Sequence, residues 1–249
     1  MVNTNCIVIN NATFGYKKNN QPNAVLRNIN LEFNKSDFIG IVGLNGSGKS
    51  TLLKTLCGLL TPLSGEVYIN EKNLSQLSTL ELAKQISVVL TEKISGFNLT
   101  CYDAVAAGQL PYTNLFNTLN TDNIKQINNA ITVCGLVQHQ DKLLNELSDG
   151  LFQKTMIAKC VAQQTPIMML DEPSAFLDYA SKHDLFLLLK KFASEEQKCV
   201  LVSSHDLDLV LKYCTKLLLI GNSSAELINV TEAIEHPVFK ELSGGYLSY

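Results

Sequence analysis

The sequence contains a single arginine, Arg27, and no closely spaced run of basic residues. Its formal net charge is -3, whereas proteins that bind nucleic acids usually present a dense basic surface. We therefore expect no nucleic-acid partner. The single arginine also argues against a site built on arginine phosphate clamps or arginine fingers.

Membrane-length apolar runs and paired cysteines are also missing. No apolar run approaches the length that crosses a membrane, and the first residues lack the basic start of a signal peptide. The seven cysteines are scattered and include no C-x-x-C pair, which indicates buried free thiols in a reducing compartment rather than disulfides or a zinc site. We expect a soluble, intracellular chain whose role at any membrane depends on a partner.

The most informative segment covers residues 43–51, with the sequence GLNGSGKST. It fits G-x-x-x-x-G-K-[ST], a glycine-rich loop whose backbone amides can surround a chain of phosphates. An apolar run at residues 38–42 indicates a buried strand before the loop, and leucines at helical spacing follow it. A strand, a tight loop and a helix N-terminus together form an anion site. The segment therefore predicts a nucleotide-binding loop in which Lys49 reaches the terminal phosphates and the Ser50 hydroxyl binds Mg²⁺.

The predicted nucleotide contacts in this loop include glycines, which allow backbone angles and close approaches that a Cβ atom forbids. The contacts are Gly43, Asn45, Gly46, Ser47, Gly48, Lys49, Ser50 and Thr51.

The rest of the chain alternates between strand-like and helical patterns. Strands are expected at residues 6–14, 26–33, 38–42, 66–70, 86–90, 167–170, 199–203 and 216–220. Helical patterns dominate from about residue 92 to 160 and return at segments such as 182–192. Strands alternating with helices predict an α/β fold with a mostly parallel sheet. We expect one domain over residues 1–249, with a core at about 1–91 and 161–249 and a helical subdomain at about 92–160.

Polar residues follow two of the expected buried strands. Asp171 and Glu172 come directly after the strand at 167–170, and His205 comes shortly after the strand at 199–203. Because parallel strands gather their carboxyl ends at one edge of a sheet, these side chains are expected near the phosphates. Asp171 can bind Mg²⁺ directly or through water, and Glu172 can accept a proton from an attacking water.

Two further features have ordinary structural explanations. Residues 147–151, LSDGL, precede an expected helix at 152–161, where a small polar residue serves as an N-cap. The remaining histidines lack the setting of His205, and we expect them at the surface. They are His139, His183 and His236.

Taken together, these segments resemble the ATPase subunit of an ATP-binding-cassette (ABC) transporter over nearly the whole chain. Residues 43–51 resemble the Walker A loop of that family, 167–172 its Walker B strand, 147–151 its signature, and 174–178 its D-loop. His205 resembles its switch histidine, and Tyr16 lies where the family stacks an aromatic ring on adenine.

The resemblance implies a RecA-like P-loop NTPase core with an N-terminal antiparallel β-subdomain and an inserted helical subdomain. It implies ATP and Mg²⁺ as cofactors, with Glu172, His205 and Lys49 as catalytic residues. Two copies of the chain are expected to pair head to tail, so that each ATP lies between the phosphate loop of one copy and Ser148 and Gly150 of the other. Asp178 of the D-loop is a further expected nucleotide contact.

The same resemblance implies the other partners. They are integral membrane permease subunits and, indirectly, an extracytoplasmic substrate-binding protein. The chain is then expected to be peripheral, on the cytoplasmic face of the inner membrane.

The sequence departs from the family pattern at several positions. Thr91 and Glu92 stand where the family has a glutamine that ligates Mg²⁺ and senses the membrane partner, and either residue could bind Mg²⁺ through oxygen. Asp149 replaces a glycine and Leu151 a glutamine or glutamate in the signature, which could slow hydrolysis. Residues 242–245, LSGG, match the signature by letters, but neither a helix nor a Walker B strand follows, so we interpret them as a chance turn.

The cargo is suggested by residues 105–112, VAAGQLPY. They resemble the V-x-x-G-R-x-P-[YH] stretch of cassettes that serve iron-siderophore, haem and cobalamin importers, with Gln109 in place of the arginine. We therefore expect an importer of a metal chelate or related cofactor, in which this stretch contacts the permease. The structural alternative is a helix that ends at Gly108 before a Pro-Tyr turn.

Other functions stay open at this point. The chain could be a soluble cassette ATPase that works on DNA, ribosomes or iron–sulfur cluster assembly. It could also be a nucleotide-sensing module with little catalysis, or serve a transporter for a different cargo.

Overall fold

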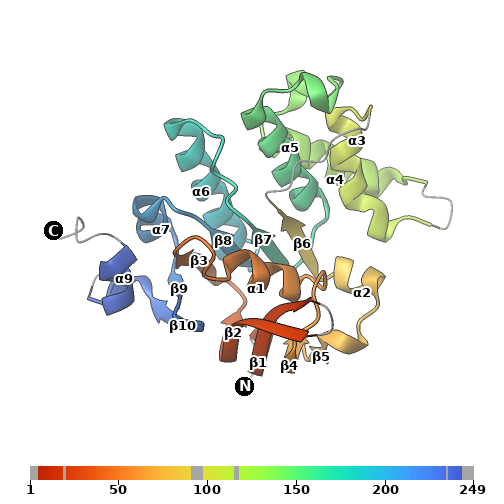
Figure 1. Ribbon diagram of the computed structural model, residues 1–249. Helices are drawn as coiled ribbons and strands as arrows, with labels where there is room; N and C mark the ends of the chain where they lie inside the picture. Colours follow the sequence, from red (N-terminus) through yellow and green to blue (C-terminus); the bar gives the residue numbers. More distant parts are fainter. Residues whose placement is uncertain (1–4, 19–20, 91–97, 115–117, 234, 243–249) are drawn as a thin grey trace.

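The structure, a computed structural model, describes residues 5–18, 21–90, 98–114, 118–233 and 235–242. Its strands form two sheets (Figure 1). A four-stranded antiparallel sheet has the order β2-β1-β4-β5 and consists of β1 (Asn5–Lys18), β2 (Gln21–Asn34), β4 (Ser64–Ile69) and β5 (Lys72–Asn73). A six-stranded sheet has the order β10-β9-β3-β8-β7-β6 and is parallel except for the pair β9/β10. It consists of β3 (Phe38–Gly43), β6 (Ile86–Val89), β7 (Ile167–Leu170), β8 (Cys199–Ser203), β9 (Lys216–Gly221) and β10 (Ser224–Asn229).

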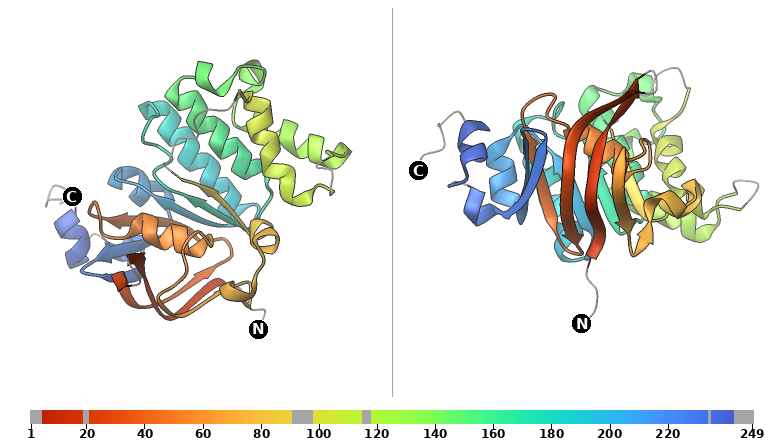
Figure 2. Two further views of the ribbon diagram at one scale, coloured as in Figure 1. Left: turned by 45° about the vertical axis from the view of Figure 1, so that its right-hand side comes forward. Right: turned by 60° about the horizontal axis from the view of Figure 1, so that its bottom comes forward.

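The helices fall into separate groups around these sheets. Helix α1 (Lys49–Leu56) follows β3, and α2 (Thr79–Ala83) precedes β6. The chain between β6 and β7 contains α3 (Cys101–Ala106), the 3₁₀ helix Ala107–Tyr112, α4 (Thr121–Val133) and α5 (Asp149–Ala162). The later helices are α6 (Tyr179–Ser194), α7 (Leu207–Tyr213), α8 (Val230–Ala233) and α9 (Pro237–Leu242). Figures 1 and 2 show α3, α4 and α5 at one side of the molecule and the antiparallel sheet at the opposite side.

The six-stranded sheet separates two hydrophobic cores. In β7, Ile167 and Met169 belong to the core that contains residues of α1 and the antiparallel sheet. Met168 and Leu170 belong to the core that contains residues of α5 and α6. This alternation follows from the period of two along a strand, and both faces are apolar because both are covered. The buried sheet is a rigid support that brings the ends of β3, β7 and β8 together.

The expected α/β fold with an N-terminal antiparallel β-subdomain is confirmed. The expected strands are all present, although β1 extends well beyond the predicted 6–14. Helices α5 and α6 begin earlier than predicted, because Ser148 and Asp178 act as N-caps that the apolar pattern does not mark. The sequence pattern missed β10 and α7. The boundaries of the helical subdomain at about 92 and 160 stay a prediction.

Every helix in these ranges is too short or too polar to cross a lipid bilayer. All seven cysteines are free thiols, as the sequence predicted. The other histidines, His139, His183 and His236, are half-buried and partly accessible at the surface. For His183 the cause is an aromatic neighbour, since its Nδ1 lies 2.8 Å from the Tyr213 hydroxyl.

Candidate nucleotide-binding site

The loop between β3 and α1 has the shape of a cradle for an anion. A Cβ atom on Gly43 would lie 2.5 Å from the Ile220 carbonyl oxygen and 2.6 Å from Ser47 Oγ, so no larger residue fits there. Gly48, the N-cap of α1, has φ of 114°, a conformation that favours glycine. The Ser47 hydroxyl is buried and has no hydrogen-bond partner among the described residues. Together with free amides at the start of α1, that hydroxyl suits the oxygen atoms of a phosphate chain.

The Lys49 side chain is hydrogen-bonded to the backbone of this loop. The side chain is largely buried, and Nζ donates to the carbonyl oxygens of Gly43 at 2.7 Å and Leu44 at 3.2 Å. Burial lowers the pKa of Lys49, while the nearby carboxylates of Glu172 and Asp171 act in the opposite direction. The ammonium is therefore poorly solvated, and a phosphate would be a strongly stabilising partner for it.

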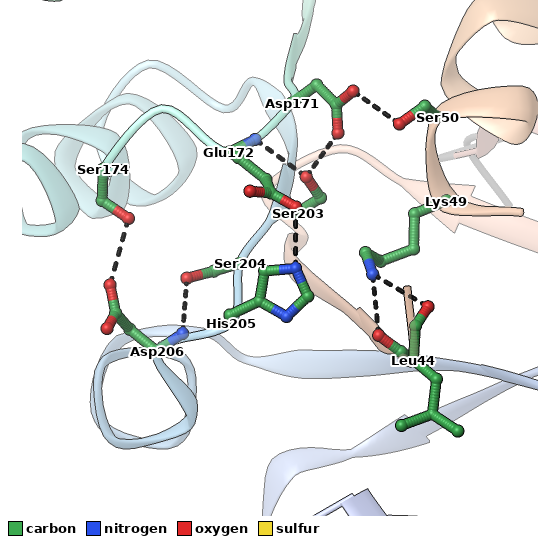
Figure 3. A network of polar contacts seen from close by, with 11 residues as sticks. Leu44, Lys49, Ser50, Asp171, Glu172, Ser174, Ser203, Ser204, His205 and Asp206 are labelled. Atoms are coloured by element: carbon green, nitrogen blue, oxygen red, sulfur yellow. Dashed lines mark hydrogen bonds and ion pairs between the residues drawn. The ribbon is translucent and has the colours of Figure 1, made fainter. Parts of the chain in front are cut away.

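Asp171 forms hydrogen bonds with two serines, Ser50 and Ser203 (Figure 3). Its Oδ2 accepts a hydrogen bond of 2.7 Å from Ser50 Oγ, and its Oδ1 accepts one of 2.6 Å from Ser203 Oγ. The Ser203 hydroxyl also accepts the backbone N–H of Glu172 at 2.8 Å. A hydroxyl oxygen facing a carboxylate oxygen is the kind of hard donor pair that Mg²⁺ prefers, so these residues fit the metal. Within the described ranges, no group of three or more histidine, cysteine, aspartate or glutamate side chains is arranged to hold a metal ion.

Glu172 and His205 contact each other beside this pair. His205 Nε2 lies 2.8 Å from Glu172 Oε1 (Figure 3). Glu172 has φ of 48°, an uncommon conformation for a residue with a Cβ atom. Such a conformation persists only where neighbouring groups hold it, and the hydrogen bond to Ser203 does so here. The strands β7 and β8 thus deliver a carboxylate and an imidazole to the same edge of the sheet, as the sequence predicted.

A second set of contacts joins the segments that follow these strands. Asp206 Oδ2 accepts hydrogen bonds from Lys182 Nζ at 2.9 Å and Ser174 Oγ at 3.3 Å. The backbone N–H of Asp206 donates to Ser204 Oγ at 3.0 Å. Ser203, Asp206 and Lys182 are site residues that were not predicted from the sequence. Ser203 could have been predicted from the sequence, because it is a polar residue at the end of a buried strand. Lys182 could not, because no sequence motif marks it.

Tyr16 reaches the same region from the antiparallel sheet. Its hydroxyl lies 3.0 Å from Thr51 Oγ1 on α1, and its side chain stays partly exposed. An exposed aromatic face next to the start of α1 is free to stack on a flat ring such as adenine. Asn45 and Gly46 lie on the exposed side of the loop.

The structure does not bring Ser148 and Gly150 to the phosphate loop of the same chain. Ser148 caps α5 through a hydrogen bond of 3.4 Å from the Leu151 N–H, and Gly150 lies in the first turn of that helix. Figure 1 shows α5 well separated from α1. Any contact of these residues with a nucleotide at the loop therefore requires a second copy of the chain.

Asp178 has a structural partner. Its carboxylate accepts the Ser181 N–H at 2.7 Å and caps α6, and this hydrogen bond lowers the pKa of Asp178. Thr91 and Glu92, together with residues 243–245, lie outside the described residues.

Comparisons with known proteins agree with this geometry. The family model described as ABC transporter matches residues 26–175. The chain is 42% identical over 198 residues to the ABC transporter ATP-binding protein MJ0873 of Methanocaldococcus jannaschii, which covers 80% of this chain and 68% of that protein. It is 32% identical over 206 residues to the ferric enterobactin transport ATP-binding protein FepC of Escherichia coli, which covers 83% of this chain and 74% of that protein.

Among solved structures, the chain resembles the dimeric structure of MJ0796, a bacterial ABC transporter cassette, with a TM-score of 0.81. The two sequences are 26% identical, and the match covers 90% of this chain and 98% of that one. The family match over more than half of the chain therefore assigns this protein to the ABC transporter family, as an ATP-binding subunit that hydrolyses ATP.

Proposed function

We propose that this chain drives an importer of a metal chelate or a related large cofactor, such as an iron-siderophore, haem or cobalamin. ATP is hydrolysed at the loop of residues 43–51, and the observation that carries this assignment is the contact of Glu172 with His205 beside the Ser50–Asp171 pair. The cargo assignment is supported by the similarity to FepC, a ferric enterobactin transport protein, and by residues 105–112.

The proposed mechanism distributes the work among residues of the site. Lys49 and the amides of the phosphate loop bind the terminal phosphates. Ser50 and Asp171 hold Mg²⁺, which supplies positive charge next to the phosphates when it is bound. Glu172 accepts the proton of the attacking water, and His205 orients the Glu172 carboxylate and hydrogen-bonds to the terminal phosphate. Thr91, outside the described residues, is a third candidate metal ligand.

We propose a head-to-tail dimer as the working unit. The support is that α5, the helix that Ser148 caps, is separate from α1 in Figure 1, and that the similar cassette MJ0796 was solved as a dimer. The Asp178 carboxylate already accepts a hydrogen bond as the cap of its helix. It binds the nucleotide only if closure of the dimer breaks this hydrogen bond or adds the nucleotide as a second partner.

The proposed contact with the permease involves fewer residues of the 105–112 stretch than the sequence pattern suggested. Gln109 is buried, where it donates to the Ala162 carbonyl oxygen and accepts a hydrogen bond of 2.8 Å from Asn123 Nδ2. The Gln109 side chain therefore connects neighbouring helices and is not accessible to the permease. Leu110 and Tyr112 are partly exposed beside it, and we assign the permease contact to them.

The proposed partners are integral membrane permease subunits in the inner membrane and, indirectly, a substrate-binding protein outside it, with this chain on the cytoplasmic face. The cargo is bound by those proteins and not by this chain. The test is growth of a deletion strain with an iron chelate, haem or cobalamin as the limiting nutrient, combined with purification of the tagged chain. Loss of uptake of one of these nutrients and copurification of a polytopic membrane protein are expected. Normal uptake of all of them, with a defect in export, would contradict the importer assignment.

The same strain allows two informative variants. Lys49→Ala should fail to restore uptake, because ATP binding is lost. Leu110→Asp should also fail, yet keep the ATPase activity of the purified chain, because it affects only docking. Equal restoration by Leu110→Asp and the native chain would place the docking surface elsewhere.

A further inference from the structure

We infer that Lys182 is a positioning residue for ATP hydrolysis, which acts through Asp206 to hold the segments that carry Glu172 and His205. This inference rests on the proposed catalytic roles of Glu172 and His205. Lys182 itself lies on α6 and belongs to none of the sequence motifs that predicted the site.

The conformation of Asp206 is the first observation. Asp206 occupies the N-cap position of α7, where an aspartate side chain ordinarily accepts the first amides of its helix. Its side chain makes no capping hydrogen bond. Oδ2 instead accepts hydrogen bonds from Lys182 at 2.9 Å and from Ser174 at 3.3 Å. The Asp206 carboxylate therefore binds two residues that are far away in the sequence and no amide of its own helix, and Lys182 is the charged one of the two.

The second observation is what these contacts connect. Ser174 follows Glu172 in the segment after β7, and Asp206 follows His205 in the segment after β8. The Ser174–Asp206 contact is thus a second link between the segments, in addition to the 2.8 Å contact of Glu172 with His205 (Figure 3). The His205 side chain is 49% exposed, so packing restrains it little. Its position therefore depends on the turn that Ser204 and Asp206 form on either side of it.

Lys182 is well placed to hold this turn. Helix α6 is anchored in the core by Leu185, Phe186 and Leu189, which makes it a rigid support for the lysine stem. The Lys182 and Asp206 side chains are 24% and 38% exposed, and ion pairs that remain in contact with solvent contribute little to folding stability. Loss of the pair should therefore affect the geometry of the site far more than the stability of the protein, because small displacements of reacting groups are costly.

The experiment compares steady-state ATP hydrolysis by the full chain and by Lys182→Met, which keeps the length of the side chain and removes its charge. We expect kcat to fall about tenfold, with KM for ATP within about twofold of the native value and Tm nearly unchanged. Lys182→Arg should recover most of the turnover. Lys190→Met is the matched control, because Lys190 is an exposed lysine of the same helix.

A double-mutant cycle with Asp206→Asn tests the connection. If Lys182 acts through Asp206, the double variant should lose no more turnover than the more damaged single variant. Native turnover in Lys182→Met, or fully additive losses in the double variant, would overturn the inference while leaving the ATPase assignment intact. Native turnover in Glu172→Gln, measured alongside, would instead show that the proposed catalytic role of Glu172 is wrong.

Discussion

Ser203 Oγ donates a hydrogen bond of 2.6 Å to Asp171 Oδ1, in the interior of the protein. The same hydroxyl accepts the backbone N–H of Glu172, so it connects the proposed metal ligand to the proposed general base. Ser203 ends β8 and Asp171 directly follows the neighbouring parallel strand β7, which explains how residues far apart in the sequence come within hydrogen-bond distance.

Ser203→Ala should therefore damage the site. It removes the hydrogen bonds that Ser203 makes with the Asp171 carboxylate and the Glu172 amide, which should lower the free energy of unfolding by about 1–3 kcal/mol. We also expect kcat to fall about tenfold as the strained Glu172 backbone relaxes. The matched control is Ser87→Ala, since Ser87 is a fully buried serine of the same sheet that contacts Thr165. The control should lose stability without a comparable loss of kcat in ATPase assays. Equal effects on kcat would show that Ser203 has only a structural function.

Glu172→Gln should separate nucleotide binding from hydrolysis. The amide keeps the size of the side chain and its contact with His205, but it cannot accept a proton from water. Turnover should fall by at least about 100-fold. ATP binding should survive, and size-exclusion chromatography should show an ATP-dependent dimer, whereas Lys49→Ala should weaken binding itself. Turnover near the native rate in Glu172→Gln is the outcome that rejects this residue as the base.

The lowered pKa of Lys49 predicts a pH dependence of ATP affinity. Burial lowers the pKa in the free protein, and bound phosphates favour the ammonium and raise it. Between these two pKa values, binding takes up a proton, so affinity should fall as pH rises. Below the lower pKa, this group should contribute no pH dependence.

Calorimetric titrations from neutral pH to about pH 10 can measure this slope. Lys49→Arg should flatten it, because a guanidinium stays charged over the whole range. An unchanged slope in Lys49→Arg would mean that another group takes up the proton.

Tyr16 offers a test of adenine stacking that separates its ring from its hydroxyl. Tyr16→Phe removes only the contact with Thr51, and ATP affinity should change little. Tyr16→Ala removes the ring and should weaken binding about tenfold. Because stacking tolerates any base, ATP and GTP should lose affinity to similar extents in fluorescence titrations. Native affinity in Tyr16→Ala would exclude a stacking function.

The remaining prediction concerns Glu92, which lies outside the described residues. If Glu92 replaces the family glutamine as the coupling residue, Glu92→Ala should abolish transport or stimulation of the ATPase in reconstituted vesicles. Nucleotide binding should survive. Unchanged transport would shift the coupling function to Thr91 or to water.

Features that depend on residues adjacent in the chain can be predicted from the sequence. The loop at 43–51 needs glycines at fixed positions next to a strand and a helix, and those requirements are visible in consecutive letters. The buried strands are equally legible, because β7 and β8 are covered on both faces and consist of unbroken apolar runs. The convergence of Asp171, Glu172 and His205 follows from the parallel sheet that these strands predict.

The directions in which several side chains point depend on contacts that form only when the chain folds. Gln109 belongs to a stretch that resembles a docking sequence, yet it faces inward, because Asn123 and the Ala162 carbonyl satisfy its amide. Asp206 occupies the N-cap position of α7, but its carboxylate binds Lys182 instead of the amides of that helix. In both cases a contact between segments far apart in the sequence outcompetes the local preference, and the energy of such a contact depends on a geometry that exists only after the chain has folded.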